Sequence, residues 1–293
     1  MVTTVRTARS VVEAGRKVLL RHADDFSRRG DERLQAQELL EHAAGSPLDD
    51  EDRIDPHVEK RFEDLIGRRT TGEPVAYIRG FEDFRGLRLT VKPGVFIPRQ
   101  STEFLAEQAI RRLRGRKDPV AADLATGLGA VALAMAREVP KTRVYATDIS
   151  PMAQRLARAN AKSLGLKNVR ILAGSMFDPF PGSLKGSFDV IASHPPYIAN
   201  GELTELPKEL VQFEPITALV GSSEDGLGLI RVLVSGAVEW LKPGGWLCVE
   251  LAPDLTRKVR PMMLLAGYDR VSITRGISDD SRVLVGRRTR GAP

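Results

Sequence analysis

The first quarter of the chain places apolar residues three or four positions apart between charged residues. This spacing puts the apolar side chains on one face of a helix. It predicts a helix around residues 11–20, a second in DERLQAQELLEHAAG that ends at Gly45, and a third in HVEKRFEDLIGRRTTG. The polar stretch SPLDDEDRIDP connects the last two. Residues 1–76 are therefore expected to form a small helical domain.

The pattern changes after residue 76. Residues 77–97 mix aromatic and β-branched residues with Gly and Pro, which is typical of a short hairpin and predicts a linker of that kind. From residue 98 to residue 293, apolar runs alternate with amphipathic stretches, and the candidate strands are VAADLA, RVYATDI, VRILAGS, FDVIASH and GGWLCVEL. This alternation predicts an α/β domain with a mainly parallel sheet and helices on both faces.

Composition places the chain among globular proteins of a reducing compartment. It has 293 residues, of which 42% are hydrophobic, and a single cysteine, Cys248, which cannot form an intrachain disulfide. The first residues lack a signal-like apolar run, and stretches such as AVALAMA are much shorter than the roughly 20 residues that span a bilayer. We expect a cytoplasmic protein without a membrane partner. The sequence does not indicate an oligomeric state.

The net charge of +6 raises the question of nucleic-acid binding. The basic residues are dispersed among 38 acidic ones, and the densest groups, RRLRGRK and GRRTR, lie at a helix–strand junction and near the end of the chain. A dispersed distribution is typical of a solvated surface rather than a nucleic-acid footprint. Nucleic acid is therefore disfavoured as a partner.

A glycine-rich turn follows the first candidate strand of the α/β region. In DLATGLGA, Gly127 and Gly129 allow the backbone to approach a ligand closely, and the next helix offers free amide hydrogens there. Asp148 ends the second strand, 19 residues after Gly129, close to the offset at which a carboxylate reaches ribose hydroxyls. The alternatives are an ordinary tight turn and an acid at a helix N-terminus. Ala132 replaces the third glycine of a dinucleotide motif, which disfavours hydride transfer.

His194-Pro195-Pro196-Tyr197 follows another candidate strand. Prolines fix φ near −65° and leave the preceding carbonyl oxygens as rigid acceptors. Such acceptors suit the NH₂ group of a planar amide or guanidine, which hydrogen bonds can orient for attack. Tyr197 can stack on a flat group of this kind.

Together these segments resemble the HemK/PrmC type of N5-glutamine methyltransferases, which transfer a methyl group from S-adenosylmethionine to a glutamine of peptide-chain release factors. The similarity covers nearly the whole chain. It is carried by EPVAYIRGFEDFRGLRLTVKPGVFIPRQSTE, DLATGLGAVALAMA, SHPPYIA, FEPITALVGSSEDGLGLIR and LKPGGWLCVEL. The resemblance implies a Rossmann-like class I methyltransferase domain at residues 98–293, after a helical substrate-recognition domain and the hairpin linker.

The resemblance also implies roles for individual residues. It places Asp148 on the ribose hydroxyls and Ile149 against the adenine of S-adenosylmethionine. The full cofactor set is Asp123, Ala125, Gly127, Gly129, Asp148, Ile149, Ser175 and Met176; the catalytic set is His194, Pro195 and Tyr197; the acceptor pocket adds Phe96, Arg99 and Pro196. No metal site is expected, because His22, His42 and His57 lack the spacing of metal ligands.

The chain departs from the family pattern at three positions. Ala125 stands for the first glycine of the cofactor loop, Ser175 for an acid after the third strand, and His194 for the asparagine of an Asn-Pro-Pro-Tyr motif. Asparagine offers an amide both a donor and an acceptor, whereas a neutral histidine offers one of each at a different angle. A histidine titrates near pH 6.5 and can remove a proton, which a guanidinium must lose before attack.

The histidine favours a different methyl acceptor. The predicted activity is therefore methylation of a planar nitrogen other than the release-factor glutamine, namely the guanidine of arginine or of a small metabolite. A genuine release-factor glutamine methyltransferase and a non-catalytic cofactor- or protein-binding module are the alternatives, and methylation of nucleic-acid bases ranks last. Glu250, at the end of a strand-like run, either faces the site or is an edge carboxylate.

Overall fold

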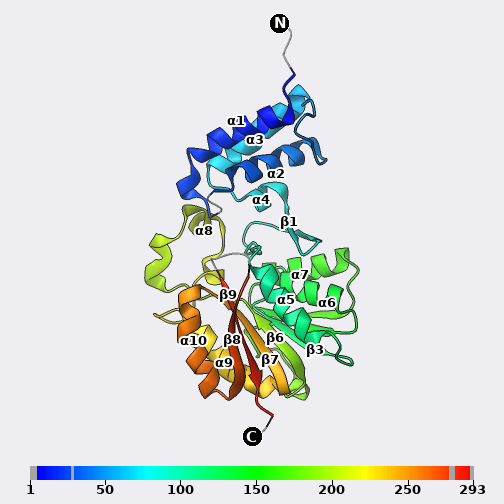
Figure 1. The fold of residues 1–293 in the computed structure, drawn as a ribbon, viewed down its shortest axis with the longest axis vertical. Coiled ribbons are helices and arrows are strands. Elements are labelled where there is room, and N and C mark those ends of the chain that lie inside the picture. The colour runs from blue at the N-terminus through cyan, green and yellow to red at the C-terminus, as the bar shows by residue number, and fades with distance from the viewer. Residues whose placement is uncertain (1–4, 28–29, 277–280, 291–293) are drawn as a thin grey trace. The chain divides into compact units, whose positions relative to one another are not determined.

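The computed structural model describes residues 5–27, 30–276 and 281–290. These residues form two compact units (Figure 1). The helical unit contains the chain up to Phe81 with Val91–Gly94 and Thr204–Glu214, and the sheet unit contains Glu82–Thr90, Val95–Leu203 and the chain from Pro215 onward. Each unit has its own hydrophobic core.

The helical unit confirms the three helices that the apolar spacing predicts. Asp55 caps the third of them by accepting a hydrogen bond from the His57 N–H at 2.7 Å, and Gly45 ends the second with a left-handed φ of 80°. Helices α1, α2 and α3 pack side by side in Figure 1. The helices of this unit are α1 Ala8–Leu20, η1 Ala23–Asp25, α2 Glu32–Ala44, α3 Pro56–Thr70, α4 Val75–Arg79 and α8 Lys208–Phe213.

Helix α8 comes from the middle of the α/β sequence but belongs to the helical unit, where a buried ion pair holds it. Arg69 Nη2 lies 3.0 Å from Glu209 Oε2, and the same oxygen accepts the Ser27 N–H at 2.7 Å. The Arg69 guanidinium also donates to Gln35 Oε1 and lies 3.6 Å from the centre of the Phe26 ring. The sequence pattern assigned all of residues 98–293 to one domain. It did not indicate that residues 204–214 belong to the helical unit.

The linker contains the expected hairpin, formed by β1 Phe81–Phe84 and β2 Leu87–Thr90. Residues 77–79, which the sequence assigned to the hairpin, instead complete helix α4. Pro74 precedes that helix, and Gly80, with φ of 78°, ends it. The aromatic and β-branched residues there are buried on a helical turn rather than on a strand.

The sheet unit confirms the predicted α/β class. Within the described residues its sheet has seven strands in the order β5-β4-β3-β6-β7-β9-β8. The first five in this order are parallel, and the last two, which no sequence pattern singled out, are antiparallel to their neighbours. The strands are β3 Val120–Leu124, β4 Arg143–Asp148, β5 Val169–Ala173, β6 Phe188–Ser193, β7 Leu241–Leu251, β8 Tyr268–Arg275 and β9 Arg282–Arg288.

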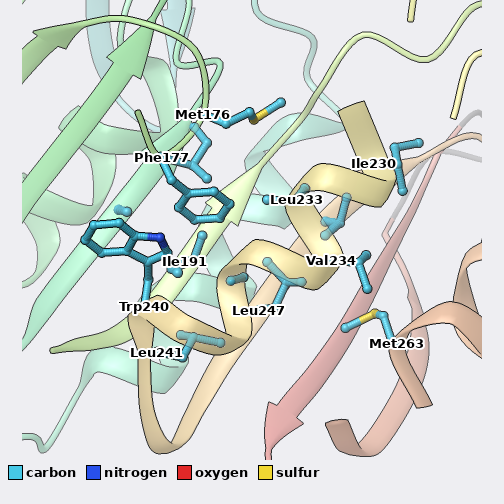
Figure 2. Packing of buried hydrophobic residues seen from close by; sticks show 14 of the residues in the cluster. Met176, Phe177, Ile191, Ile230, Leu233, Val234, Trp240, Leu241, Leu247 and Met263 are labelled. Carbon is cyan, nitrogen blue, oxygen red and sulfur yellow. The ribbon is translucent and has the colours of Figure 1, made fainter. Parts of the chain in front are cut away.

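Helices cover both faces of this sheet (Figure 1). They are α5 Thr102–Leu113, α6 Ala130–Glu138 and α7 Pro151–Ser163 on one face, and α9 Gly228–Trp240 and α10 Pro253–Leu265 on the other; short 3₁₀ turns are η2 Gly182–Leu184, η3 Asn200–Glu205 and η4 Ile216–Ala218. Figure 2 shows the core between α9 and the sheet, where Trp240 stacks on Phe177 with ring centres 6.0 Å apart. Within the described residues, no helix combines the length and apolar character that crossing a bilayer requires.

The strand order fixes where a ligand can bind. From β3 the chain proceeds to β4 and β5 on one side of the sheet, and it then crosses to β6 on the other side of β3. Ligands of open parallel sheets bind outside the carboxyl ends of the strands at such a switch point. Here those ends carry residues 125–129 after β3, Ile149 after β4 and residues 194–197 after β6.

Candidate active site

The two glycines of the loop after β3 do different things. Gly127 has φ of 57°, and among the described residues no atom other than those of its chain neighbours lies within 4 Å of the position where a Cβ would sit, so there is open space beside the backbone there. Gly129 has φ of 96°, and a Cβ there would meet Leu133 and Ala157 at 3.2–3.3 Å. Gly127 therefore provides the approach to a ligand, while Gly129 allows the first turn of α6 to pack against α7.

Asp148 joins the ends of two neighbouring strands. Its Oδ2 accepts the Gly127 N–H at 2.8 Å, and its Oδ1 accepts the Ser150 N–H at 2.8 Å at the start of α7. Burial raises the pKa of the Asp148 carboxyl above its ordinary value, although these hydrogen bonds oppose the shift. Each carboxylate oxygen keeps a lone pair that can accept a further hydrogen bond.

The surroundings of Asp148 fit the adenosine half of S-adenosylmethionine. The neighbouring Ile149 side chain is 60% exposed, which is unusual for so large an apolar residue at a strand end. An exposed apolar surface beside a carboxylate, with open space over Gly127, matches an adenine ring next to a ribose diol. These are the residues that would hold the cofactor.

Asp123 lies inside the fold rather than at its surface. It is only 2% exposed, and its Oδ2 accepts hydrogen bonds from Thr126 Oγ1 at 2.5 Å and from the Ala132 N–H at 3.1 Å. Burial raises the pKa of this carboxyl to about 7. Asp123 thus holds the glycine loop through these hydrogen bonds from its buried side. Its partner Thr126 was not singled out by the sequence pattern.

This raised pKa predicts a pH dependence of stability. The ordinary pKa of the Asp123 carboxyl is 3.8, so between pH 4 and pH 7 the unfolded chain loses a proton that the folded chain keeps. The contribution of Asp123 to the free energy of unfolding therefore falls as pH rises through this range, by about 2 kcal/mol between about pH 5 and pH 7. Asp123→Asn should remove that slope in urea unfolding. An unchanged difference between the two pH values would contradict the assignment.

The segment that follows β5 offers a cofactor less side-chain surface than the sequence analysis predicts. The Met176 side chain is buried in the hydrophobic core that also contains residues of α9 (Figure 2), and its backbone oxygen accepts a hydrogen bond from Thr147 Oγ1 at 2.9 Å. Ser175 is half-buried beside it. Any contact of Met176 with the cofactor is therefore left to its backbone.

Ala125 has a left-handed backbone, with φ of 56°, at the position where the family loop has glycine. An alanine in this conformation is strained by roughly 1 kcal/mol, because its Cβ approaches the following carbonyl. We expect Ala125→Gly to raise the free energy of unfolding by up to about 1 kcal/mol, partly offset by the larger entropy of the unfolded chain. Thermal unfolding would measure this, and a clear loss of stability would show that the alanine methyl group makes a packing contact.

The acceptor corner consists of His194 and Tyr197, which follow β6, together with Phe96 and Arg99 from the segment before α5. The His194 ring stacks on Tyr197 with centres 5.8 Å apart, and the Phe96 ring meets it edge-on at 5.9 Å. The Arg99 guanidinium lies 4.5 Å from the centre of the Phe96 ring. The structure thus brings together four residues that the sequence assigned to the acceptor side, and Pro195 and Pro196 complete the turn between the two stacked rings.

Glu250 is the residue in this corner whose role the sequence left open. It is fully buried, and strand β7 places it beside His194, because the two strands pair with Ser193 opposite Val249. Its Oε1 accepts a hydrogen bond from Ser101 Oγ at 2.9 Å, and its Oε2 lies 3.5 Å from His194 Nδ1. Glu250 therefore faces the site. Ser101 escaped the sequence analysis because only tertiary packing brings α5 to this strand end.

Tyr197 is held in its neutral form. Burial, together with the nearby negative charge of Glu250, raises the pKa of its phenol to about 12. The ring is thus an uncharged, half-buried surface on which a flat group can lie.

Comparison with known proteins agrees with this arrangement. The chain matches the PrmC N-terminal domain over residues 18–80 and the methyltransferase small domain over residues 86–213. It is 36% identical over 275 residues to the release factor glutamine methyltransferase of Rhodopirellula baltica, covering 89% of this chain and 92% of that one. The chain belongs to the release factor glutamine methyltransferase family. It is an S-adenosylmethionine-dependent N-methyltransferase, which confirms the resemblance seen in the sequence.

Other relatives have similar sequences, and solved structures have a similar fold. The release factor glutamine methyltransferases of Salmonella typhimurium and Escherichia coli are 37% and 36% identical, and the matches cover 92% of each. A methyltransferase from Pyrococcus furiosus superposes with a TM-score of 0.51 at 21% identity, over 70% of this chain and 90% of that one. The Thermus thermophilus 16S rRNA N2 G1207 methyltransferase gives 0.54 at 20% identity, over 71% and 49%. These structures share the fold of the sheet unit.

Proposed function

We propose that this enzyme methylates N5 of a glutamine side chain in a peptide-chain release factor. The observation that carries the proposal is the match to the Rhodopirellula baltica release factor glutamine methyltransferase over 92% of its length, which includes both the helical and the sheet parts. We further propose that the helical unit binds the release factor, since residues 18–80 match the PrmC N-terminal domain. The guanidine prediction rested on His194 alone, and the relatives support its alternative better.

When bound, the cofactor would supply an electrophilic methyl carbon on a sulfonium. The residues of this chain hold and orient it. Asp148 would accept hydrogen bonds from the ribose hydroxyls, Ile149 would cover one face of the adenine, and the open backbone at Gly127 would leave room for the remainder. Asp123 acts only through the loop that it fixes.

The acceptor corner orients a flat nitrogen for in-line attack. The carbonyl oxygens of His194 and Pro195 each precede a proline, so their directions are set by a stiff backbone. A hydrogen bond from one N–H of an amide NH₂ to such an oxygen would orient the nitrogen for attack and leave its second N–H for another acceptor, and the neutral Tyr197 ring would exclude water from one side. This positioning is the main contribution of the corner to the rate.

A second acceptor class is favoured by one observation. The buried Glu250 side chain lies 3.5 Å from His194 Nδ1, and a histidine beside a carboxyl group is a common general base for taking a proton from a substrate such as a guanidinium. The guanidine of arginine or of a small metabolite is therefore the second candidate. It requires a proton transfer before attack that an amide does not need.

The deciding experiment is a competition among acceptors. The enzyme is incubated with labelled S-adenosylmethionine and full-length release factor, free arginine, related guanidines, glutamine peptides and nucleic acid, and each product is located by mass analysis. We expect one methyl group on one glutamine of the release factor. Labelling of a guanidine alone would overturn the proposal in favour of the second candidate. Cofactor binding without any transfer would indicate a non-catalytic binding module.

A further inference from the structure

One oxygen of the buried Glu250 carboxylate has no hydrogen-bond donor among the described residues. Glu250 is 0% exposed, and its Oε1 is occupied by the Ser101 hydroxyl. Its Oε2 is buried and makes no hydrogen bond, and the ionisable group beside it is His194 Nδ1 at 3.5 Å. A buried carboxylate oxygen without a donor is unfavourable by about 1–3 kcal/mol or more. An N–H group at Nδ1 would meet this need.

The second neighbour of Nδ1 is compatible with the same proton position. Thr102 Oγ1 lies 3.3 Å from Nδ1, and a hydroxyl can either accept from an N–H group or donate to a lone pair. An ionised carboxylate can only accept. Because a lone pair on Nδ1 would face the Glu250 oxygen, the two neighbours together favour the tautomer with the proton on Nδ1.

The other ring nitrogen is then a free acceptor. In a neutral imidazole with its proton on Nδ1, Nε2 carries the lone pair. Within the described part of the chain, no side chain or backbone group forms a hydrogen bond with His194 Nε2. Tyr197 stacks on the ring and Phe96 packs against it edge-on, so the ring orientation is restrained on two sides.

We propose that Glu250 is a positioning residue that holds His194 as the Nδ1–H tautomer, so that Nε2 accepts an N–H from the methyl acceptor. The inference rests on the proposed function, in which that group is an amide NH₂. The nitrogen lone pair forms the N–C bond while the C–S pair leaves with sulfur, and the N–H proton passes to Nε2. The resulting imidazolium lies beside the Glu250 carboxylate until its proton is released to solvent.

With His194 in this tautomer, the acceptor corner is more selective than it would be with an asparagine at position 194. Asparagine can donate as well as accept, and it therefore also tolerates an acceptor group that presents an oxygen. His194 in this tautomer presents only a lone pair to the substrate. The corner thus selects groups that carry an N–H, and it contains the proton acceptor for the step.

Nitrogen NMR of the full-length enzyme with ¹⁵N-labelled histidine tests the tautomer directly. The chain has four histidines, and the His194 signals are those lost in His194→Asn. In the neutral ring we expect a protonated Nδ1 and an unprotonated Nε2. Glu250→Gln, which can still accept from Ser101 but can also donate to Nδ1, should shift the population toward the Nε2–H form, whereas the exposed control Glu239→Gln should not.

Kinetics test the consequence. With the acceptor found in the competition experiment, Glu250→Gln should lower kcat by at least about 10-fold while changing KM for the acceptor and the Kd of S-adenosylmethionine by less than about 3-fold. A wild-type ring protonated on Nε2, or kinetics of Glu250→Gln equal to those of Glu239→Gln, would overturn the inference. The NMR result does not depend on the acceptor. A failed glutamine assay would therefore refute only the proposed function, and a contrary tautomer in an enzyme that methylates glutamine would refute only this inference.

Discussion

Glu209→Gln is expected to lower the free energy of unfolding of the helical unit by about 3–5 kcal/mol. Glutamine keeps an oxygen for the Ser27 N–H, but it removes the negative charge 3.0 Å from the buried Arg69 guanidinium. Loss of a charged partner of a buried guanidinium is strongly unfavourable even though Arg69 keeps its bonds to Gln35 and to the carbonyl oxygens of Gly72 and Glu73. Hydrogen exchange of the α3 and α8 amides would measure the loss, which should be largest where α8 is held.

Glu63→Gln is the matched control, because Glu63 lies exposed on α3 of the same unit. Its effect should stay within about 0.5 kcal/mol, as expected for a surface substitution. If Glu209→Gln were equally mild, the ion pair would not be what keeps residues 204–214 in the helical unit. That segment would then need another explanation, such as the hydrogen bond from Tyr77 Oη to the Phe213 carbonyl oxygen.

Asp148→Asn is expected to raise the Kd of S-adenosylmethionine by at least about 100-fold, or roughly 2.7 kcal/mol. Both carboxylate oxygens accept backbone N–H groups, from Gly127 and from Ser150. An asparagine would place its NH₂ group against one of those N–H donors, so the loop must move and the acceptor for the ribose hydroxyls is lost. Isothermal titration calorimetry with S-adenosylmethionine gives the affinity of each variant.

The exposed Asp64 provides the control for this prediction, since Asp64→Asn removes the same charge from the helical unit, outside the strand ends. Its Kd should equal that of the wild type. A Kd for Asp148→Asn within about 3-fold of the wild-type value would mean that Asp148 serves only as a helix N-terminal acid, which is the alternative that the sequence left open.

Local periodicity was enough to predict the helices α1 to α3 and the five parallel strands. The antiparallel strands β8 and β9 were missed. Strand β8 at the sheet edge is rich in charged and polar residues, with mostly exposed or half-exposed positions after Tyr268, so it lacks the clear apolar alternation of a half-buried strand. The place of α8 was missed for another reason. The Arg69–Glu209 pair joins residues 140 positions apart, and no local pattern shows it.

The candidate site likewise contains residues that a local pattern predicts and residues that only tertiary packing brings in. Residues that end or follow parallel strands, such as Gly127, Asp148 and His194, could be assigned to one sheet edge from the strand pattern alone. The Ser101–Glu250–His194 arrangement could not, because it depends on the register of β6 with β7 and on the position of the first turn of α5. The sequence could show that asparagine is replaced by histidine. It could not show that the histidine lies beside a buried carboxylate.

The most direct test of this account is a crystal structure of the enzyme with S-adenosylmethionine bound. We expect the ribose hydroxyls on Asp148, the adenine against Ile149, and the methyl carbon directed toward residues 194–197. A donor bound elsewhere, or a methyl carbon directed away from that turn, would contradict it.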